Sequence, residues 1–179
     1  MKQNKVEKLL AGVLSISLAM GVSVMPAFAA QVQGPPYEDM SRVYLTKNYE
    51  LANTGTLSPE ETFTFTIDPG TVTDASEGIE AADYMPNVGD VTYAQGEAGS
   101  ASKTKKIEIK LPEYDSVGVY TYIIHEAAGN SAGVTYYDDA ILLRETVIEQ
   151  DGKLRIAAVH TEDPESTGEG KKDDFDDLY

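Results

Sequence analysis

Apolar residues recur at every second position in several short segments of the chain, and this spacing is the strongest constraint on its fold. The clearest case is "ETFTFTI" (61–67), in which Phe63, Phe65 and Ile67 alternate with threonines. Successive side chains of a strand point to opposite faces of a sheet, so this spacing predicts a strand with one buried face. The same pattern or a similar apolar run occurs in residues 43–49, 105–114, 118–126, 134–150, 154–160 and 175–179.

Turn signals separate these segments, and we find no convincing long helix. "DPG" (68–70) is expected to end the "ETFTFTI" strand, and "QDGK" (150–153) predicts a hairpin. Residues 71–102 are rich in Gly, Ala, Ser and acids, and we interpret them as a long surface excursion with one helical turn near 76–84. Short strands joined by turns predict an all-β sandwich.

The N-terminus has the pattern of a secretory signal peptide. A basic start is followed by the apolar run "LLAGVLSISLAMGVSVM" and by Ala27-Phe28-Ala29, which fits the A-x-A cleavage rule. We therefore predict a signal peptide at 1–29, a flexible lead-in at 30–40 and one folded domain at 41–179. The mature protein is expected to be secreted or held at the cell surface, with no membrane segment.

Charge and cysteine content limit the partners and the chemistry. Without residues 1–29 the chain keeps 11 basic and 29 acidic residues, and it has no cysteine. Such an acidic surface argues against nucleic acid or anionic lipid as a partner. The absence of cysteine excludes disulfides, thiol catalysis and cysteine metal sites.

Common enzyme and metal motifs are also missing. The sequence has no phosphate-binding glycine loop and no G-x-S-x-G motif. His125 and His160 have no metal-ligand spacing, and the acidic segment "YYDDA" (136–140) lacks the pattern of a calcium loop. We expect no cofactor, no metal and no enzyme with turnover.

Three ionisable residues fall in phase with the apolar face of their strands: Lys47, Glu126 and Asp177. Charges on edge strands that deter aggregation would explain any one of them. All three together are harder to explain in this way, because unpaired buried charges are costly. Burial would favour a neutral amine and a neutral carboxylic acid, a set that can condense to an amide when the fold holds the groups in contact.

The residues around this set resemble a known family. "VYLTKNYE", "ETFTFTI", "IKLPEYDSVGVYTYIIHEAAGNSAGVTYYDDA" and "FDDLY" are similar to the isopeptide-linkage domain of Gram-positive major (backbone) pilins, the streptococcal pilin family. The resemblance implies an immunoglobulin-like (Cna B-type) β-sandwich in which a first-strand lysine bonds to a last-strand asparagine. It assigns Lys47 as the amine and Glu126 as the residue that promotes the reaction, with Asp177 in place of the asparagine.

The resemblance further implies a structural cell-surface pilin or adhesin stalk domain. Its partners would be other pilin subunits or further domains of the same surface protein, and a sortase. No LPxTG-like motif follows Tyr179; we expect the N-terminal part of a longer cell-wall protein rather than a domain secreted without covalent attachment. We find no convincing sortase-linkage lysine, and the nearest candidates are Lys171 and Lys172.

Two other functions remain open at this point. The same sandwich could bind a host protein or a glycan through the loops at 71–102 and 127–135, and an exposed aromatic platform there would favour this function. A secreted hydrolase with paired carboxylates would have to use Glu126 and Asp177.

Overall fold

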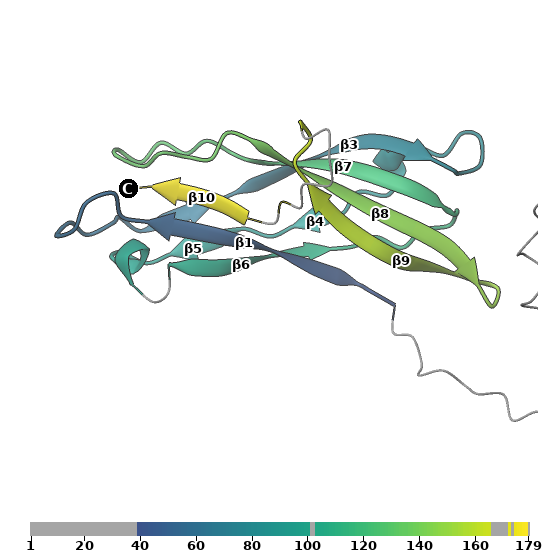
Figure 1. Cartoon of the computed structure of the whole chain (residues 1–179), viewed down its shortest axis with the longest axis horizontal. Coiled ribbons are helices and arrows are strands. Elements are labelled where there is room, and N and C mark those ends of the chain that lie inside the picture. Colours follow the sequence, from purple (N-terminus) through teal and green to yellow (C-terminus); the bar gives the residue numbers. More distant parts are fainter. Residues whose placement is uncertain (1–38, 101–102, 166–171, 173, 179) are drawn as a thin grey trace, which may run out of the picture. The chain divides into compact units, whose positions relative to one another are not determined.

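The structure, a computed structural model, describes residues 39–100, 103–165, 172 and 174–178 (Figure 1). Its regular elements are strands and two short 3-10 helices. They are β1 (Arg42–Glu50), β2 (Glu61–Phe63), β3 (Phe65–Thr73), η1 (Ala81–Asp83), β4 (Asn87–Val88), β5 (Val91–Tyr93), η2 (Glu97–Gly99), β6 (Thr104–Lys110), β7 (Gly118–Glu126), β8 (Ala140–Gln150), β9 (Lys153–Glu162) and β10 (Asp174–Leu178).

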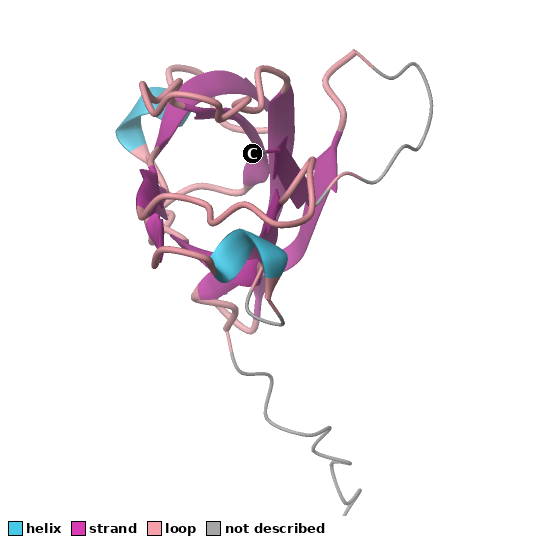
Figure 2. Cartoon of the chain, turned by 90° about the vertical axis from the view of Figure 1, so that its left-hand side faces the viewer, coloured by secondary structure: helices cyan, strands magenta, loops and turns pink. Residues whose placement is uncertain are grey.

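The strands form an immunoglobulin-like (Cna B-type) β-sandwich, as predicted. One four-stranded sheet has the order β10-β1-β6-β4, a second has the order β3-β7-β8-β9, and β2 pairs with β5. Seen from the end of the molecule, the strands surround a common interior (Figure 2). Apolar side chains from both four-stranded sheets fill that interior, among them Leu45, Ile109, Tyr120 and Leu143.

The first and last strands lie side by side and run parallel (Figure 1). Their register places Lys47 opposite Phe175 and Tyr49 opposite Asp177. Two parallel strands cannot be joined by a tight turn, and here the rest of the domain forms the connection. The pairing brings together two segments at opposite ends of the domain.

Strand β7 lies between β3 and β8, and its residues alternate between buried and partly buried positions, except that Thr121 is also buried. A strand that is apolar on both faces and has a neighbour on each side lies well inside the fold. Its last residue, Glu126, is opposite Phe65 of β3.

The prediction that residues 71–102 are a surface excursion is wrong. Val91, Tyr93, Ala81 and Ala98 in this stretch are buried and belong to the core. They lie in 3-10 turns and in a strand of three residues, each too short to show a period. Glycines and acidic residues between them hid the alternation that would have identified them.

The "DPG" segment does not end its strand either. Strand β3 continues to Thr73 through an irregularity between Pro69 and Val72. A side chain at Gly70 would overlap Thr121, since an added Cβ would lie 2.5 Å from the Thr121 hydroxyl. That hydroxyl instead accepts a hydrogen bond from the backbone N–H of Thr71, at 2.7 Å. Gly70 thus allows a bulge where the sequence suggested a turn.

Two further strand predictions need correction. "ETFTFTI" is divided at Thr64 between β2, which pairs with β5, and β3, which pairs with β7. Residues 136–139 form a loop, and β8 begins at Ala140.

The signal peptide and most of the lead-in fall outside the described residues, as does Tyr179.

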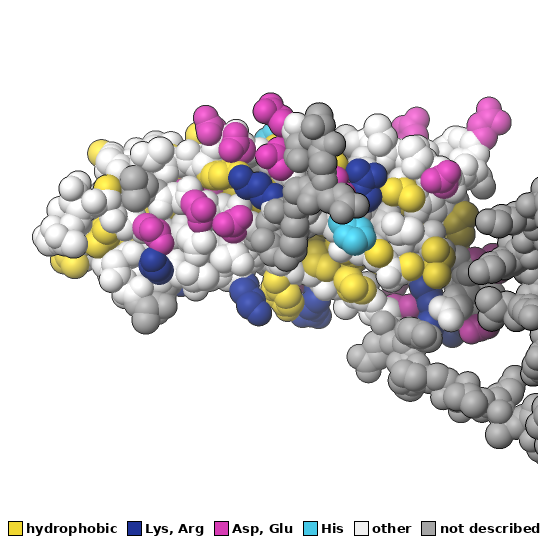
Figure 3. Space-filling view, in the orientation of Figure 1, with side chains coloured by type: hydrophobic (Ala, Val, Ile, Leu, Met, Phe, Trp, Pro, Cys, Tyr) yellow, Lys and Arg dark blue, Asp and Glu magenta, His cyan; other side chains and the backbone are white. Residues whose placement is uncertain are grey.

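Among the residues that the structure describes, no helix has the length and apolar character needed to cross a membrane. The face of the described domain seen in Figure 3 carries acidic side chains along its upper border and over its left half, and several basic ones along its lower border.

Substitution of Tyr93 tests whether this part of residues 71–102 belongs to the hydrophobic core. Its ring is fully buried, and its hydroxyl lies 2.6 Å from the Lys47 carbonyl oxygen and 3.0 Å from that of Lys103. We expect Tyr93→Phe to lower the free energy of unfolding by about 1–2 kcal/mol, because a buried hydrogen bond is lost. Thermal unfolding followed by circular dichroism would measure it. The control Tyr44→Phe changes an exposed tyrosine. Equal unfolding midpoints for the two variants would contradict the assignment of Tyr93 to the buried core.

Candidate functional site

The structure brings Lys47, Glu126 and Asp177 into direct contact. Lys47 Nζ lies 2.6 Å from Glu126 Oε2 and 2.7 Å from Asp177 Oδ1, and all three side chains have zero exposure. The three residues come from β1, β7 and β10. We call this buried set the Lys-Glu-Asp triad.

The strand pattern places each member of the triad. Lys47 lies between Leu45 and Tyr49, which are both buried on the inner face of β1. Glu126 follows Tyr122 and Ile124 in the same phase, and Asp177 follows Phe175. Each charged group therefore takes the place of a core side chain and points into the interior.

Aromatic rings surround the triad. Lys47 Nζ lies 4.3 Å from the centre of the Phe63 ring, close enough for a cation–π interaction. Phe63 makes edge-to-face contacts with Tyr49 and Tyr93, and Phe175 packs against Phe65. These rings exclude water, which strengthens the electrostatic interactions inside the site and makes ionised groups costly.

The protonation state of the triad follows from this burial. Burial and the neighbouring Asp177 carboxyl raise the pKa of Glu126 and Lys47 lowers it, and together these effects place the pKa at about 8. Glu126 Oε1 and Asp177 Oδ2 have no hydrogen-bond donor among the described residues. A proton on Glu126 removes one buried charge and supplies a donor where two acceptors lack one.

A backbone group missed by the sequence analysis also reaches the triad. The N–H of Tyr137 donates a hydrogen bond to Asp177 Oδ1, at 3.0 Å. The Tyr137 ring packs edge-to-face on Phe175, with ring centres 5.1 Å apart. No side-chain pattern could have indicated this contact, because the donor is a main-chain amide in a loop.

Glu145 is a buried carboxyl outside the triad, and here a signal was present but not used. It alternates with Ile141, Leu143 and Val147 on the inner face of β8 and is fully buried. Its Oε2 accepts a hydrogen bond from the Tyr114 hydroxyl at 2.8 Å, whereas Oε1 has no donor among the described residues. Burial raises the pKa of Glu145 and the hydrogen bond from Tyr114 lowers it in part, so that the pKa is about 7.

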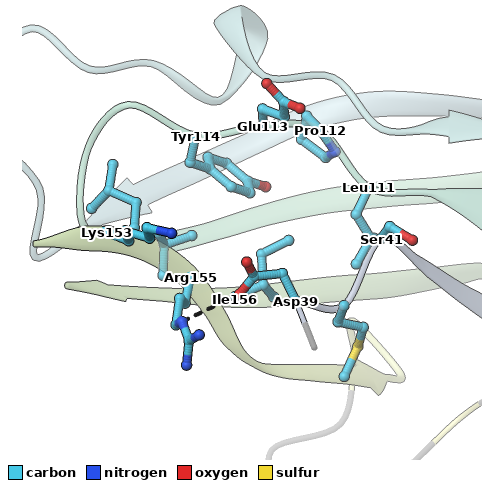
Figure 4. Close-up of a pocket in the computed structure, with 12 residues that line it drawn as sticks. Asp39, Ser41, Leu111, Pro112, Glu113, Tyr114, Lys153, Arg155 and Ile156 are labelled. Atoms are coloured by element: carbon cyan, nitrogen blue, oxygen red, sulfur yellow. Dashed lines mark ion pairs between the residues drawn. The ribbon is translucent and has the colours of Figure 1, made fainter. Parts of the chain in front are cut away.

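A surface groove of about 520 Å³ lies at the beginning of β1 and beside the β8–β9 hairpin (Figure 4). Asp39 pairs there with Arg155 at 3.4 Å, and Tyr114 and Ile156 also line it. No member of the triad lines this groove. The candidate site is thus a closed contact within the core and not a pocket.

Other candidates from the sequence do not join the triad. Across the described residues, no group of three or more His, Cys, Asp or Glu is placed to hold a metal ion. Lys172 is partly buried, with its ammonium 4.7 Å from the centre of the Tyr137 ring. Lys171 lies outside the described residues.

Comparison with known proteins gives consistent matches. Residues 43–179 match the family model described as Spy0128-like isopeptide containing domain (FctA). A curated protein named Pilin, from Streptococcus pyogenes serotype M1, is 28% identical over 122 residues, which are 66% of this chain and 36% of that protein. The chain thus spans about a third of this relative.

Solved structures agree in fold. The major pilin of Streptococcus pyogenes matches with a TM-score of 0.59 and 24% identity, over 77% of this chain and 50% of that one. The T3.2 major pilin of the same species matches with a TM-score of 0.64 and 18% identity, over 79% of this chain and 53% of that one. Both support the β-sandwich, and this chain spans about half of each.

The buried Glu145 carboxyl predicts a pH dependence of stability. Its pKa is raised on folding, so its stabilising contribution is present below the unfolded pKa near 4.5 and is lost as pH rises through about 7. Glu145→Gln keeps the shape without this titration. At pH 8 we expect the free energy of unfolding of the variant to exceed that of the original protein by about 2 kcal/mol, with a smaller difference at pH 5. Thermal unfolding at the two pH values measures both differences.

Glu149→Gln, at an exposed position of the same strand, is the matched control and should show no such pH-dependent gain. A Glu145→Gln variant that is equally destabilised at both pH values would contradict the raised pKa.

Proposed function

Since the chain belongs to the family of Spy0128-like isopeptide-containing domains, we propose that it is a structural pilin or adhesin stalk domain closed by an autocatalytic isopeptide bond between Lys47 and Asp177. The observation that carries the proposal is the Lys-Glu-Asp triad, in which an amine contacts two carboxyl groups at 2.6 and 2.7 Å with zero exposure. Glu126 promotes the reaction.

Burial favours a reaction within the chain over one on an external substrate. A hydrolase needs its carboxylates open to the substrate, whereas both carboxylates here are closed off and occupied by Lys47. The nucleophile and the acyl group instead belong to the same molecule and are already in contact. Such proximity can supply much of the rate of a condensation. Each molecule reacts once, so the domain is not an enzyme with turnover.

The steps balance with Glu126 as a proton carrier. The Lys47 ammonium first gives a proton to the Asp177 carboxylate, which leaves a neutral amine and a neutral acid. The amine nitrogen then attacks Asp177 Cγ, and protonated Glu126 donates its proton to the departing oxygen. A C–N bond forms, a C–O bond breaks and one water leaves. Glu126 takes the remaining excess proton from the nitrogen and ends as it began.

The bond would join the two terminal strands of the domain. It would close a loop from residue 47 to residue 177 and, by the entropy estimate used for disulfides, stabilise the fold by about 5 kcal/mol. Because β1 and β10 are adjacent and parallel, tension applied at one end would pass directly into the other strand. An amide also resists reducing agents, which suits a stalk outside the cell.

This function sets the expected partners and location. The relatives named pilin support a role on the cell surface, in a pilus or at the cell wall, with other pilin subunits or further domains as partners. A sortase is a further expected partner. These assignments extend beyond the part of the relatives that this chain spans.

The alternative of a binding module lacks a supporting observation. The exposed large hydrophobic residues of the described chain are Met40, Tyr44, Leu57, Val117 and Ile148. None of them lies in the described parts of 71–102 or in 127–135, so these loops present no aromatic platform.

Intact mass tests the proposed bond. The purified protein is expected to weigh about 18 Da less than its sequence predicts, because one water is lost per condensation. Lys47→Ala and Glu126→Ala are expected to show the full mass, since the first removes the amine and the second removes the proton carrier. A full mass in the unsubstituted protein would contradict the proposal.

Asp177→Asn is the matched variant for the acyl partner. It keeps the size of the side chain and provides a carboxamide, from which ammonia leaves in place of water. We expect a deficit of about 17 Da in this variant. Asp177→Ala, which has no acyl group, is the control and should show the full mass.

A further inference from the structure

The loop between β7 and β8 carries a backbone donor, the Tyr137 N–H, that contacts the acyl group of the proposed reaction. Asp177 Oδ1 accepts two contacts, from Lys47 Nζ at 2.7 Å and from the Tyr137 N–H at 3.0 Å. The other oxygen, Oδ2, has no donor among the described residues. The two oxygens of the reacting carboxyl are therefore in different environments before any bond forms.

We propose that the Tyr137 N–H is a catalytic donor that stabilises the oxyanion formed on Asp177 Oδ1, and that the 127–139 loop is fastened to β2 to aim it. The proposal rests on the proposed function, because it assigns roles within the same condensation. Negative charge develops on a carboxyl oxygen when an amine adds to its carbon. A fixed backbone N–H at hydrogen-bond distance from that oxygen stabilises the charge without reorganising.

The donor also decides which oxygen leaves. When Lys47 Nζ adds to Asp177 Cγ, Oδ1 takes up the electron pair of the C=O bond and keeps the Tyr137 hydrogen bond. Oδ2 has no such partner; it carries the proton that the Asp177 carboxyl took from Lys47, receives a second proton from Glu126 and departs as water. The electron pair on Oδ1 then reforms the carbonyl, and the finished amide oxygen still accepts the Tyr137 N–H. The direction of the reaction follows from the asymmetry of the carboxyl.

Contacts at both ends hold the loop in place. At its start, the N–H of Ala127 donates to the Thr64 carbonyl at 2.9 Å. Further along, the Tyr136 hydroxyl donates to Glu61 Oε1 at 2.9 Å, and the Ser131 hydroxyl donates to Glu61 Oε2. Glu61 is almost fully buried, with 8% exposure, so its carboxylate depends on these donors.

Packing fixes the tyrosine next to the donor. The Tyr136 ring packs on Phe63, the ring that faces Lys47, with centres 5.9 Å apart. Gly129 lies against the hydroxyl end of this ring, since a Cβ added there would lie 2.4 Å from the Tyr136 hydroxyl oxygen. The residue that precedes the donor is thus held by Glu61, Phe63 and Gly129, and small changes in this packing would move the N–H.

The test replaces the backbone donor itself. Cell-free synthesis can insert the α-hydroxy analogue of tyrosine at Tyr137, which converts the N–H to an ester oxygen and keeps the side chain. After a short pulse, samples quenched in hot SDS at increasing times would show the linked form by gel mobility and by mass. We expect the ester at Tyr137 to slow the linkage about 100-fold, as loss of an oxyanion donor does. Resistance of each product to thermolysin reports whether it folds.

An ester at Val134 is the matched control. Its N–H donates to the Ser131 carbonyl in the same loop, at 3.2 Å, and does not reach Asp177, so the linkage should keep its normal rate. A folded Tyr137 ester that links as fast as the unmodified chain would overturn the donor role alone. If the unmodified chain never gains the linked form, the proposed function fails as well.

Tyr136→Phe keeps the ring on Phe63 and removes the bond to Glu61, so it tests the fastening of the loop without altering the donor. We expect about tenfold slower linkage with an unchanged final extent, because the donor is less well aimed. Since this variant preserves the partly buried ring, it also covers the case in which the Tyr137 ester does not fold. Linkage at the original rate would overturn the role of the loop.

Discussion

The buried contact of Lys47 with two carboxyl groups is the interaction on which the rest of the structure depends. An ammonium with zero exposure has lost its hydration, which costs several kcal/mol unless other charges and donors replace the water. Glu126 and Asp177 provide that replacement on the inner faces of β7 and β10. Two carboxyl groups around one amine leave an excess of negative charge, and a proton on Glu126 relieves it. The same conditions that make the contact costly as an ion pair make it suitable for condensation, because an amide carries no charge.

The order and direction of the strands bring the three residues of this contact together. Lys47 and Asp177 are distant in sequence, and only the parallel pairing of β1 with β10 places them side by side. Glu126 reaches them from the opposite sheet, across the aromatic core. The triad therefore connects both sheets at the place where the chain closes on itself. A covalent bond there would secure the terminal strand, which is otherwise held at the sheet edge by one neighbour.

The alternation of apolar residues at every second position predicted most of the strands and the triad, and it also set the limit of what the sequence could predict. It identified Lys47, Glu126 and Asp177 because each follows several apolar residues in phase, and it gave the sandwich because most strands are long enough to show the alternation. The same signal was present at Glu145 and should have been used. It failed for Val91 and Tyr93 because a three-residue strand shows too few periods. It could not indicate the Tyr137 N–H, because a main-chain donor leaves no mark in the choice of side chain.

A crystal structure of the purified protein at atomic resolution tests the central claim most directly, through the distance between Lys47 Nζ and Asp177 Cγ. An amide bond would appear as continuous density with a separation of about 1.3 Å and a single oxygen on Cγ. An ion pair would leave two oxygens on Cγ, with Nζ still near 2.7 Å from Oδ1. The first result is the one this account predicts, and the second, in fully folded protein, would contradict it.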